Sequence, residues 1–164
     1  MRHVRPLPPT SAAAQRLLST KPLQPTPPSV TPPNEMKSTS PAKQTIEKIC
    51  PSFRNWPRRW EGLAEDVPYG EGILTVFAPF LQQLIDSGNS RKTVRNHGNN
   101  LWLLGGEIIR QVSTFEEYDV PPRRMVMESV DSEGGLLCRH LDTPSACRSY
   151  DATCRKLHEF LNEK

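Results

Sequence analysis

The sequence predicts an all-α protein, a small bundle of four to five helices preceded by a disordered proline-rich arm. After residue 70, apolar residues recur at intervals of three and four, which is the spacing of one helix face. No segment alternates polar and apolar residues over a useful length, as a half-buried strand would. Ten of the 17 prolines fall within residues 1–45, where they oppose regular structure.

The arm, residues 1–45, has no aromatic residue, and its first acidic residue is Glu35. So little apolar surface cannot offset the entropy lost on ordering the segment. Residues 1–48 carry seven Lys or Arg and two Glu, a balance of +5, whereas residues 49–164 carry fourteen Lys or Arg and sixteen Asp or Glu, a balance of −2. The surplus positive charge therefore belongs to the arm, and the domain lacks the basic face typical of nucleic-acid-binding domains.

The sequence also predicts a cytoplasmic location. No apolar run approaches the roughly 20 residues needed to cross a bilayer, and the N-terminus lacks the apolar core of a secretory signal. Four cysteines without such a signal predict reduced thiols. The Arg- and Ser-rich, acid-poor N-terminus leaves an organellar transit peptide as the alternative.

Residues 46–70 are predicted to be a connecting segment with local structure at most. The stretch from Phe53 to Trp60, FRNWPRRW, interleaves aromatic and cationic residues. Either Phe53, Trp56 and Trp60 dock on the bundle while the arginines stay in water, or the aromatics form a stacking platform for nucleic-acid bases. Docking is favoured because buried aromatic residues outnumber such platforms.

The helical domain is predicted to span residues 71–164, and its first helix follows Gly72. Pro79 predicts that this helix kinks or begins near Thr75. Gly88 is expected to end it because glycine readily adopts a left-handed conformation. The apolar face consists of residues three and four apart: Leu74, Phe77, Leu81, Leu84 and Ile85.

The second helix is predicted to run from Arg91 to about Val112, with Ser90 as its N-cap. Three glycines interrupt it, each costing up to about 1 kcal/mol relative to alanine. They indicate that a neighbour approaches closely or that the helix bends: Gly98, Gly105 and Gly106. Its buried face is predicted to consist of Val94, Leu101, Leu104, Ile108 and Val112.

A short third helix is predicted over residues 123–130, followed by a loop over residues 131–142 that contains a Gly-Gly pair. Thr143 is expected to cap the last helix, with Pro144 at the first helical position. A buried stripe at steps of three and four then runs towards the C-terminus: Cys147, Tyr150, Cys154, Leu157 and Leu161.

The start of the second helix is the strongest candidate site. Residues 87–106 contain no Asp or Glu, and the free amides and the dipole of a helix N-terminus favour phosphate. A solvated, capped helix start is the alternative, but cations there oppose the dipole, which favours an anionic partner. Hydroxyl groups can add phosphate contacts, and an Asn or His side chain can face a groove. The candidate DNA-binding residues are Ser90, Arg91, Lys92, Thr93, Arg95, Asn96 and His97.

The stretch from Phe80 to Thr93, FLQQLIDSGNSRKT, resembles the helix–turn–helix start of the core-binding, SAM-like N-terminal domain of tyrosine recombinases and phage integrases. The stripe from Tyr150 to Leu161 resembles the last helix of that domain, so the resemblance covers residues of about 70 to 162. It implies a SAM-like bundle whose second helix, with Thr93 near its start, faces DNA phosphates.

In that family the catalytic tyrosine and its helper residues lie in a separate C-terminal domain. This chain stops at Lys164, directly after the last predicted helix. The resemblance therefore implies DNA binding in recombination or integration, without catalytic residues or strand cleavage. The implied partners are DNA and a separate recombinase catalytic subunit or another protein.

Two Cys/His pairs are candidates for a zinc site: Cys138 with His140, and Cys154 with His158, which lie one helical turn apart. Thiolate and imidazole groups suit zinc, but free cysteines on an apolar stripe pack well as buried thiols. The sequence therefore predicts no metal and no cofactor. It contains no nucleophile elbow, glycine-rich phosphate loop or paired-carboxylate motif, which predicts that the protein is not an enzyme.

The alternative function is a protein-interaction or assembly module that binds no nucleic acid. The balance of −2 in the domain favours this alternative. The arm also contains Pro-x-x-Pro spacings (Pro6 to Pro9, Pro22 to Pro25 and Pro25 to Pro28), which suit aromatic grooves that bind polyproline helices.

Overall fold

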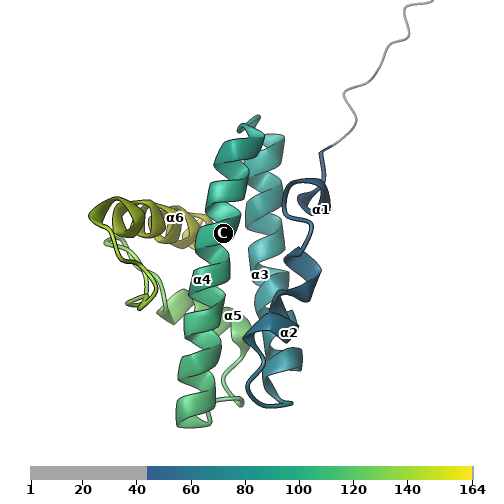
Figure 1. Ribbon diagram of the computed structural model, residues 1–164, viewed down its shortest axis with the longest axis vertical. Coiled ribbons are helices and arrows are strands. Elements are labelled where there is room, and N and C mark those ends of the chain that lie inside the picture. Colours follow the sequence, from purple (N-terminus) through teal and green to yellow (C-terminus); the bar gives the residue numbers. More distant parts are fainter. Residues whose placement is uncertain (1–43, 164) are drawn as a thin grey trace, which may run out of the picture. The chain divides into compact units, whose positions relative to one another are not determined.

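The computed structural model describes residues 44–163, and this part of the chain is all-α, as predicted (Figure 1). Among these residues, no helix combines the length and apolar character needed to cross a membrane. The arm predicted for residues 1–45 lies outside the described residues except for its last two. The elements are α1 (Ile46–Ile49), the 3-10 helix η1 (Phe53–Asn55), α2 (Trp56–Trp60), α3 (Asp66–Asp86), α4 (Arg91–Phe115), α5 (Pro122–Glu128) and α6 (Pro144–Asn162).

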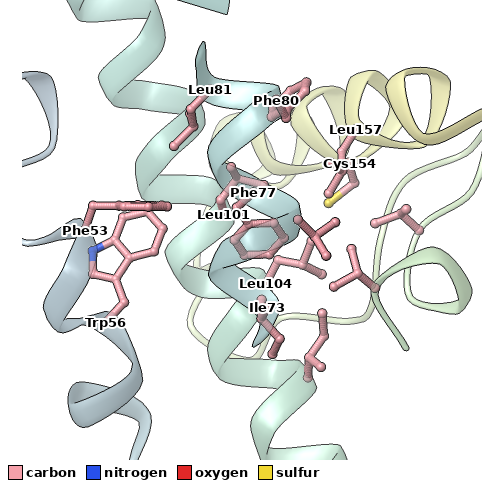
Figure 2. Close-up of a cluster of buried hydrophobic side chains, with 14 of the residues drawn as sticks. Phe53, Trp56, Ile73, Phe77, Phe80, Leu81, Leu101, Leu104, Cys154 and Leu157 are labelled. Carbon is pink, nitrogen blue, oxygen red and sulfur yellow. The ribbon is translucent and has the colours of Figure 1, made fainter. Parts of the chain in front are cut away.

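The long helices α3 and α4 lie side by side at the centre of the domain (Figure 1). The short elements α1 and α2 pack against both of them, α5 packs on α3, and α6 lies across α4. Figure 2 shows Phe53 and Trp56 on one side of this central pair and Leu157 on the other, with Phe77 and Leu104 between them. All five side chains are buried, so a single core joins the N-terminal segment to the last helix.

The segment of residues 46–70 is part of the folded domain, and the expectation of local structure at most is wrong. It contains α1, η1, α2 and the first turn of α3. The docking interpretation of its aromatics is confirmed, because Phe53 and Trp56 are buried and Trp60 is half-buried, while its arginines are exposed. These rings supply enough apolar burial to order short helices that are not stable alone.

Helix α3 begins at Asp66 and continues through Pro79, so the predicted start near Thr75 is wrong. Pro79 and Thr75 are both exposed. The Thr75 carbonyl group, which loses its amide donor at the proline, therefore lies on the solvent side. The predicted apolar face is only partly right, because Leu74, Leu84 and Ile85 are half-buried. The fully buried apolar residues of this helix are Ile73, Val76, Phe77, Phe80 and Leu81, together with Tyr69 at its start.

Two glycines of α4 allow close approach of the N-terminal segment, as one of the two sequence interpretations expected. A Cβ on Gly98 would lie 2.7 Å from Cys50 Sγ, and a Cβ on Gly105 would lie 2.3 Å from the Trp60 ring. Trp60 Nε1 also donates a hydrogen bond to the Trp102 carbonyl oxygen (3.1 Å). The residues predicted as the buried face of α4 are all buried: Val94, Leu101, Leu104, Ile108 and Val112.

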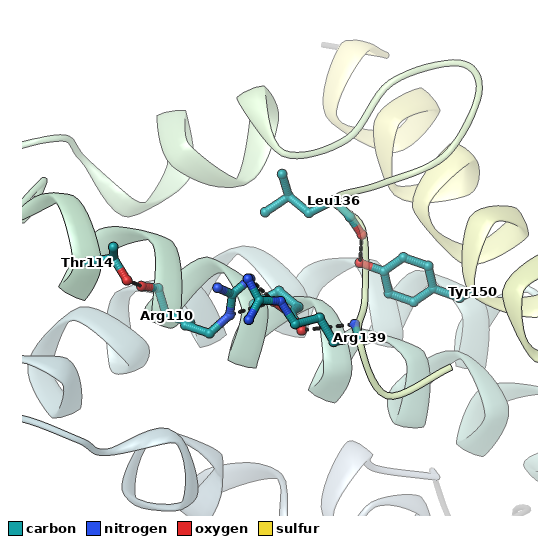
Figure 3. A network of polar contacts seen from close by, with 6 residues as sticks. Arg110, Thr114, Leu136, Arg139 and Tyr150 are labelled. Atoms are coloured by element: carbon teal, nitrogen blue, oxygen red, sulfur yellow. Dashed lines mark hydrogen bonds and ion pairs between the residues drawn. The ribbon is translucent and has the colours of Figure 1, made fainter. Parts of the chain in front are cut away.

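The turns and caps predicted around the later helices are confirmed. Gly88 has φ +78° after the end of α3, and the Thr143 hydroxyl accepts a hydrogen bond from the Ala146 amide (3.1 Å) at the start of α6. Figure 3 shows two of the contacts that hold the loop of residues 131–142. The Tyr150 hydroxyl donates to the Leu136 carbonyl oxygen (2.9 Å), and the Arg139 amide donates to Glu107 (3.3 Å).

Candidate nucleic-acid interface

The start of α4 is a capped helix N-terminus. Ser90 has an extended backbone conformation, and its hydroxyl oxygen accepts a hydrogen bond from the Thr93 amide (3.1 Å). The hydroxyl groups of Ser90 and Thr93 are hydrogen-bonded to each other (2.9 Å). The other amide groups of this first turn have no partner within an α-helix, so they and the positive end of the dipole point towards any anion placed there.

Arg91 and Arg95, two predicted phosphate ligands, also contact the end of α1. Arg91 donates to the Lys48 carbonyl oxygen (2.8 Å), and Arg95 Nε donates to the Ile49 carbonyl oxygen (3.3 Å). These carbonyl groups belong to the last turn of a helix, where cations are stabilising. Both arginines remain exposed, and each guanidinium has five N–H donors, so donors remain for a phosphate.

Lys92 and Asn96 are exposed on the same helix, one turn apart. Within the described part of the chain, neither side chain has a hydrogen-bond or ion-pair partner. They are therefore the two predicted residues whose side chains are wholly available to a ligand.

His97 lies in the interface between α4 and α6 rather than on the exposed side of α4. Its Nδ1 is 2.8 Å from the Thr153 hydroxyl oxygen, and its ring centre is 6.3 Å from that of Phe80. Burial, and to a smaller extent the nearby Lys156, lower the pKa of His97. The hypothesis that His97 faces a groove therefore has no geometric support. Its spacing from Val94 and Leu101, three and four residues, is that of the buried face.

His97 predicts a pH dependence of stability. Because the pKa of His97 is lowered in the folded state, the unfolded chain binds the proton more readily. The stability of the fold is therefore full above pH 6.5, the ordinary histidine pKa, and it falls as the pH drops towards the folded pKa. We expect the free energy of unfolding to decrease from about pH 7.5 to about pH 5.5 and to decrease less in His97→Gln. Urea unfolding at several pH values across this range measures the decrease, and a substitution of the exposed His140, His140→Gln, is the control. Equal slopes in wild type and His97→Gln would contradict the assignment.

A groove of about 450 Å³ lies next to the start of α4, between α4 and the segment from α1 to α2. Arg95 belongs both to the helix start and to the groove, and Arg59 of α2 lines it as well. No carboxylate among the residues that the structure describes lines this groove. Its lining residues are Ile49, Cys50, Pro51, Ser52, Trp56, Arg59, Arg95, Asn99, Trp102 and Leu103.

A second hollow of about 210 Å³ shares Arg59, Trp102 and Leu103 with this groove. It contains the buried Glu107, which pairs with Arg110 (Nε to Oε2, 2.9 Å) and so presents no free negative charge (Figure 3). The charged character of the surface thus changes along α4, from unpaired cations at its start to a neutralised pair near its middle.

The four metal candidates do not form a cluster. Among the described residues, no three His, Cys, Asp or Glu side chains are close enough to hold a metal ion. Cys138 and Cys154 are buried free thiols, whereas His140 is exposed and His158 is half-buried beside Asn162. Burial raises the pKa of Cys154 to about 12 and raises that of Cys138. Both shifts favour the protonated thiol, as expected for cysteines packed in an apolar core.

No protein-family model, curated protein or solved structure matches this chain. The site is therefore defined by its own geometry. The sequence indicated the start of α4, but Arg59 and Trp102 come to this site only through packing. One feature of the sequence indicates that Trp102 is exposed: it lies outside the periodic buried face of α4.

Proposed function

We propose that this protein is a DNA-binding module that contacts phosphate groups through the start of α4 and has no strand-cleaving activity of its own. The observation that carries the proposal is a helix start within residues 87–106, which contain no Asp or Glu, next to a groove without a carboxylate among its described lining residues. Lys92 is exposed at the helix start, and Arg59 and Arg95 are exposed at the groove. Phosphate contacts of this kind supply affinity and register, and base contacts supply sequence preference.

The resemblance to the recombinase core-binding domain supports the same function. It suggests that a separate recombinase catalytic subunit, or another protein, supplies the chemistry on the DNA that this module holds. The basic arm, with its balance of +5 over residues 1–48, adds nonspecific attraction to the phosphate backbone.

The test is a binding titration of the full chain against a short DNA duplex, by fluorescence anisotropy at low salt. With about four phosphate contacts, affinity should fall roughly a hundredfold between about 50 and 200 mM salt. Lys92→Glu should weaken binding about tenfold and reduce the slope of the salt dependence by about one contact. Lys92 is the sharpest choice, because Arg91 and Arg95 also hold α1 and their substitution would disturb the fold.

Arg123→Glu is the matched control for this charge reversal. Arg123 is also exposed, but it lies in α5 and does not line the groove. The proposal requires Arg123→Glu to bind as the wild type does. Absence of binding at micromolar protein, or equal losses in the two variants, would overturn it.

A protein-interaction or assembly module is the second candidate function, and two exposed apolar side chains favour it. Leu137 is 86% exposed and Phe115 is 67% exposed, and apolar side chains at such exposure often mark contact surfaces. Light scattering of the full chain distinguishes the candidates. A stable oligomer that loses its association in Phe115→Ser or Leu137→Ser and binds no DNA would favour this second function.

A further inference from the structure

The groove beside α4 combines shape, charge and aromatic surface in a way that the helix start alone does not. Its volume of about 450 Å³ lies within the range of pockets that bind small molecules. This volume suits one nucleotide-sized group, whereas the rigid outer surface of a duplex would contact only the rim.

The positive charge of the groove, which comes from Arg59 and Arg95, favours an anionic ligand. Arg95 uses its Nε on the Ile49 carbonyl oxygen (3.3 Å), which leaves its terminal amino groups for a ligand. Within the described residues, Arg59 has no ion-pair partner. Two guanidinium groups without a carboxylate between them favour a phosphate, which accepts paired hydrogen bonds from arginine.

The aromatic surface comes from two tryptophans of different exposure. Trp56 is 4% exposed and forms part of the groove wall, whereas Trp102 is 37% exposed and leaves part of its indole ring to solvent. Its neighbours Leu101 and Leu104 are fully buried. An exposed indole beside unpaired arginines is the combination on which unpaired bases stack.

We propose that this groove binds one unpaired nucleotide of the DNA, with the base on Trp102 and a phosphate held by Arg59 and Arg95. This inference rests on the proposed DNA-binding function and specifies the form of DNA that is preferred. Arg95 connects the two parts of the surface, since it lies one turn after Lys92 on α4 and also lines the groove. A strand held by its phosphates at the helix start can therefore continue into the groove wherever a base is unpaired.

The experiment compares a fully paired duplex with the same duplex carrying a short single-stranded overhang. The wild-type chain should bind the overhang DNA about tenfold more tightly, within the range for stacking of one base on an aromatic side chain. Trp102→Ala and Arg59→Glu should each remove most of this preference. Quenching of tryptophan fluorescence by the overhang DNA should decrease in Trp102→Ala.

Two matched controls separate the groove from general surface effects. Arg58→Glu reverses the same charge on the adjacent exposed residue of α2, and Phe115→Ala removes an exposed ring from the other end of α4; neither residue lines the groove. Both controls should keep the preference for the overhang, and thermal melting verifies that every variant is folded.

The outcomes distinguish the inference from the function on which it rests. If both DNAs bind equally tightly, the module binds DNA but the groove binds no unpaired nucleotide, and the inference is overturned. The inference is also overturned if the preference for the overhang DNA survives in Trp102→Ala and Arg59→Glu. If neither DNA binds, the proposed function itself fails, and binding of an acidic peptide in their place would assign the groove to a protein partner.

Discussion

Asp66→Ala should destabilise the protein by about 3 to 5 kcal/mol, because it removes hydrogen bonds to a buried charged group that contribute about 1.5 to 3 kcal/mol each, while water can reach the freed amides of the exposed residues Gly62 and Leu63. The Asp66 carboxylate is 1% exposed. It accepts hydrogen bonds from the amides of Gly62 and Leu63 (2.8 Å each) and from the Tyr118 hydroxyl (2.7 Å). One side chain thus joins the turn before α3 to the loop after α4, and chemical denaturation measures its contribution.

Two variants separate the components of this network. Tyr118→Phe removes the hydroxyl group and its hydrogen bond to Asp66 but keeps both amide hydrogen bonds, so its loss should be about 1.5 to 3 kcal/mol. Asp66→Asn keeps the size of the side chain. Its amide oxygen can still accept a hydrogen bond from Gly62 or Leu63, but its NH₂ group then faces Tyr118. The loss of stability in Asp66→Asn should therefore be intermediate. Equal losses in Asp66→Ala and Tyr118→Phe would contradict a role for the two amide donors.

Gly105→Ala should destabilise the protein by about 1 to 2 kcal/mol, although alanine is the better helix former by up to about 1 kcal/mol. The added Cβ would lie 2.3 Å from the Trp60 ring, and extra atoms in a packed interface usually cost about 1 to 3 kcal/mol. Overpacking therefore outweighs helix propensity. Thermal or urea unfolding detects the loss, and a shift of Trp60 should also change tryptophan fluorescence.

The Trp60→Ala background reverses the sign of this substitution. Without the indole ring, the three atoms nearest to the added Cβ are gone, so Gly105→Ala should stabilise that background by up to about 1 kcal/mol through helix propensity. A loss of stability in both backgrounds would show that the clash with Trp60 is not the cause.

The helices that follow residue 70 were predictable because their determinants are local. Ser90 and Thr143 each accept a hydrogen bond from an amide three residues later, and the buried face of α4 follows its spacing of three and four. His97 is polar, which favoured a position facing a groove, but its spacing from Val94 and Leu101 is that of the buried face. Periodicity alone indicates the buried face of α4, and the structure shows that α6 packs there.

The N-terminal segment and the groove were not predictable from local pattern. Residues 46–60 have weak helix patterns, and they are ordered by contacts with residues far along the chain, such as Trp60 with Gly105 and Cys50 with Gly98. The same packing brings Arg59 to the groove that Arg95 and Trp102 also line. Nothing in the spacing of these residues along the chain indicates that they meet.

The sequence by itself determined the all-α class, the caps and turns of the long helices, and the cationic, acid-free start of α4. Each of these depends on interactions within a few residues, so a single stretch of sequence contains all the atoms involved. Only the tertiary structure decided that Arg91 and Arg95 hold α1, that His97 is half-buried, and that Arg59, Arg95 and Trp102 line one groove. Those outcomes depend on contacts between residues far apart in the sequence, such as Arg95 with Ile49 and His97 with Thr153, and therefore on packing of the whole core.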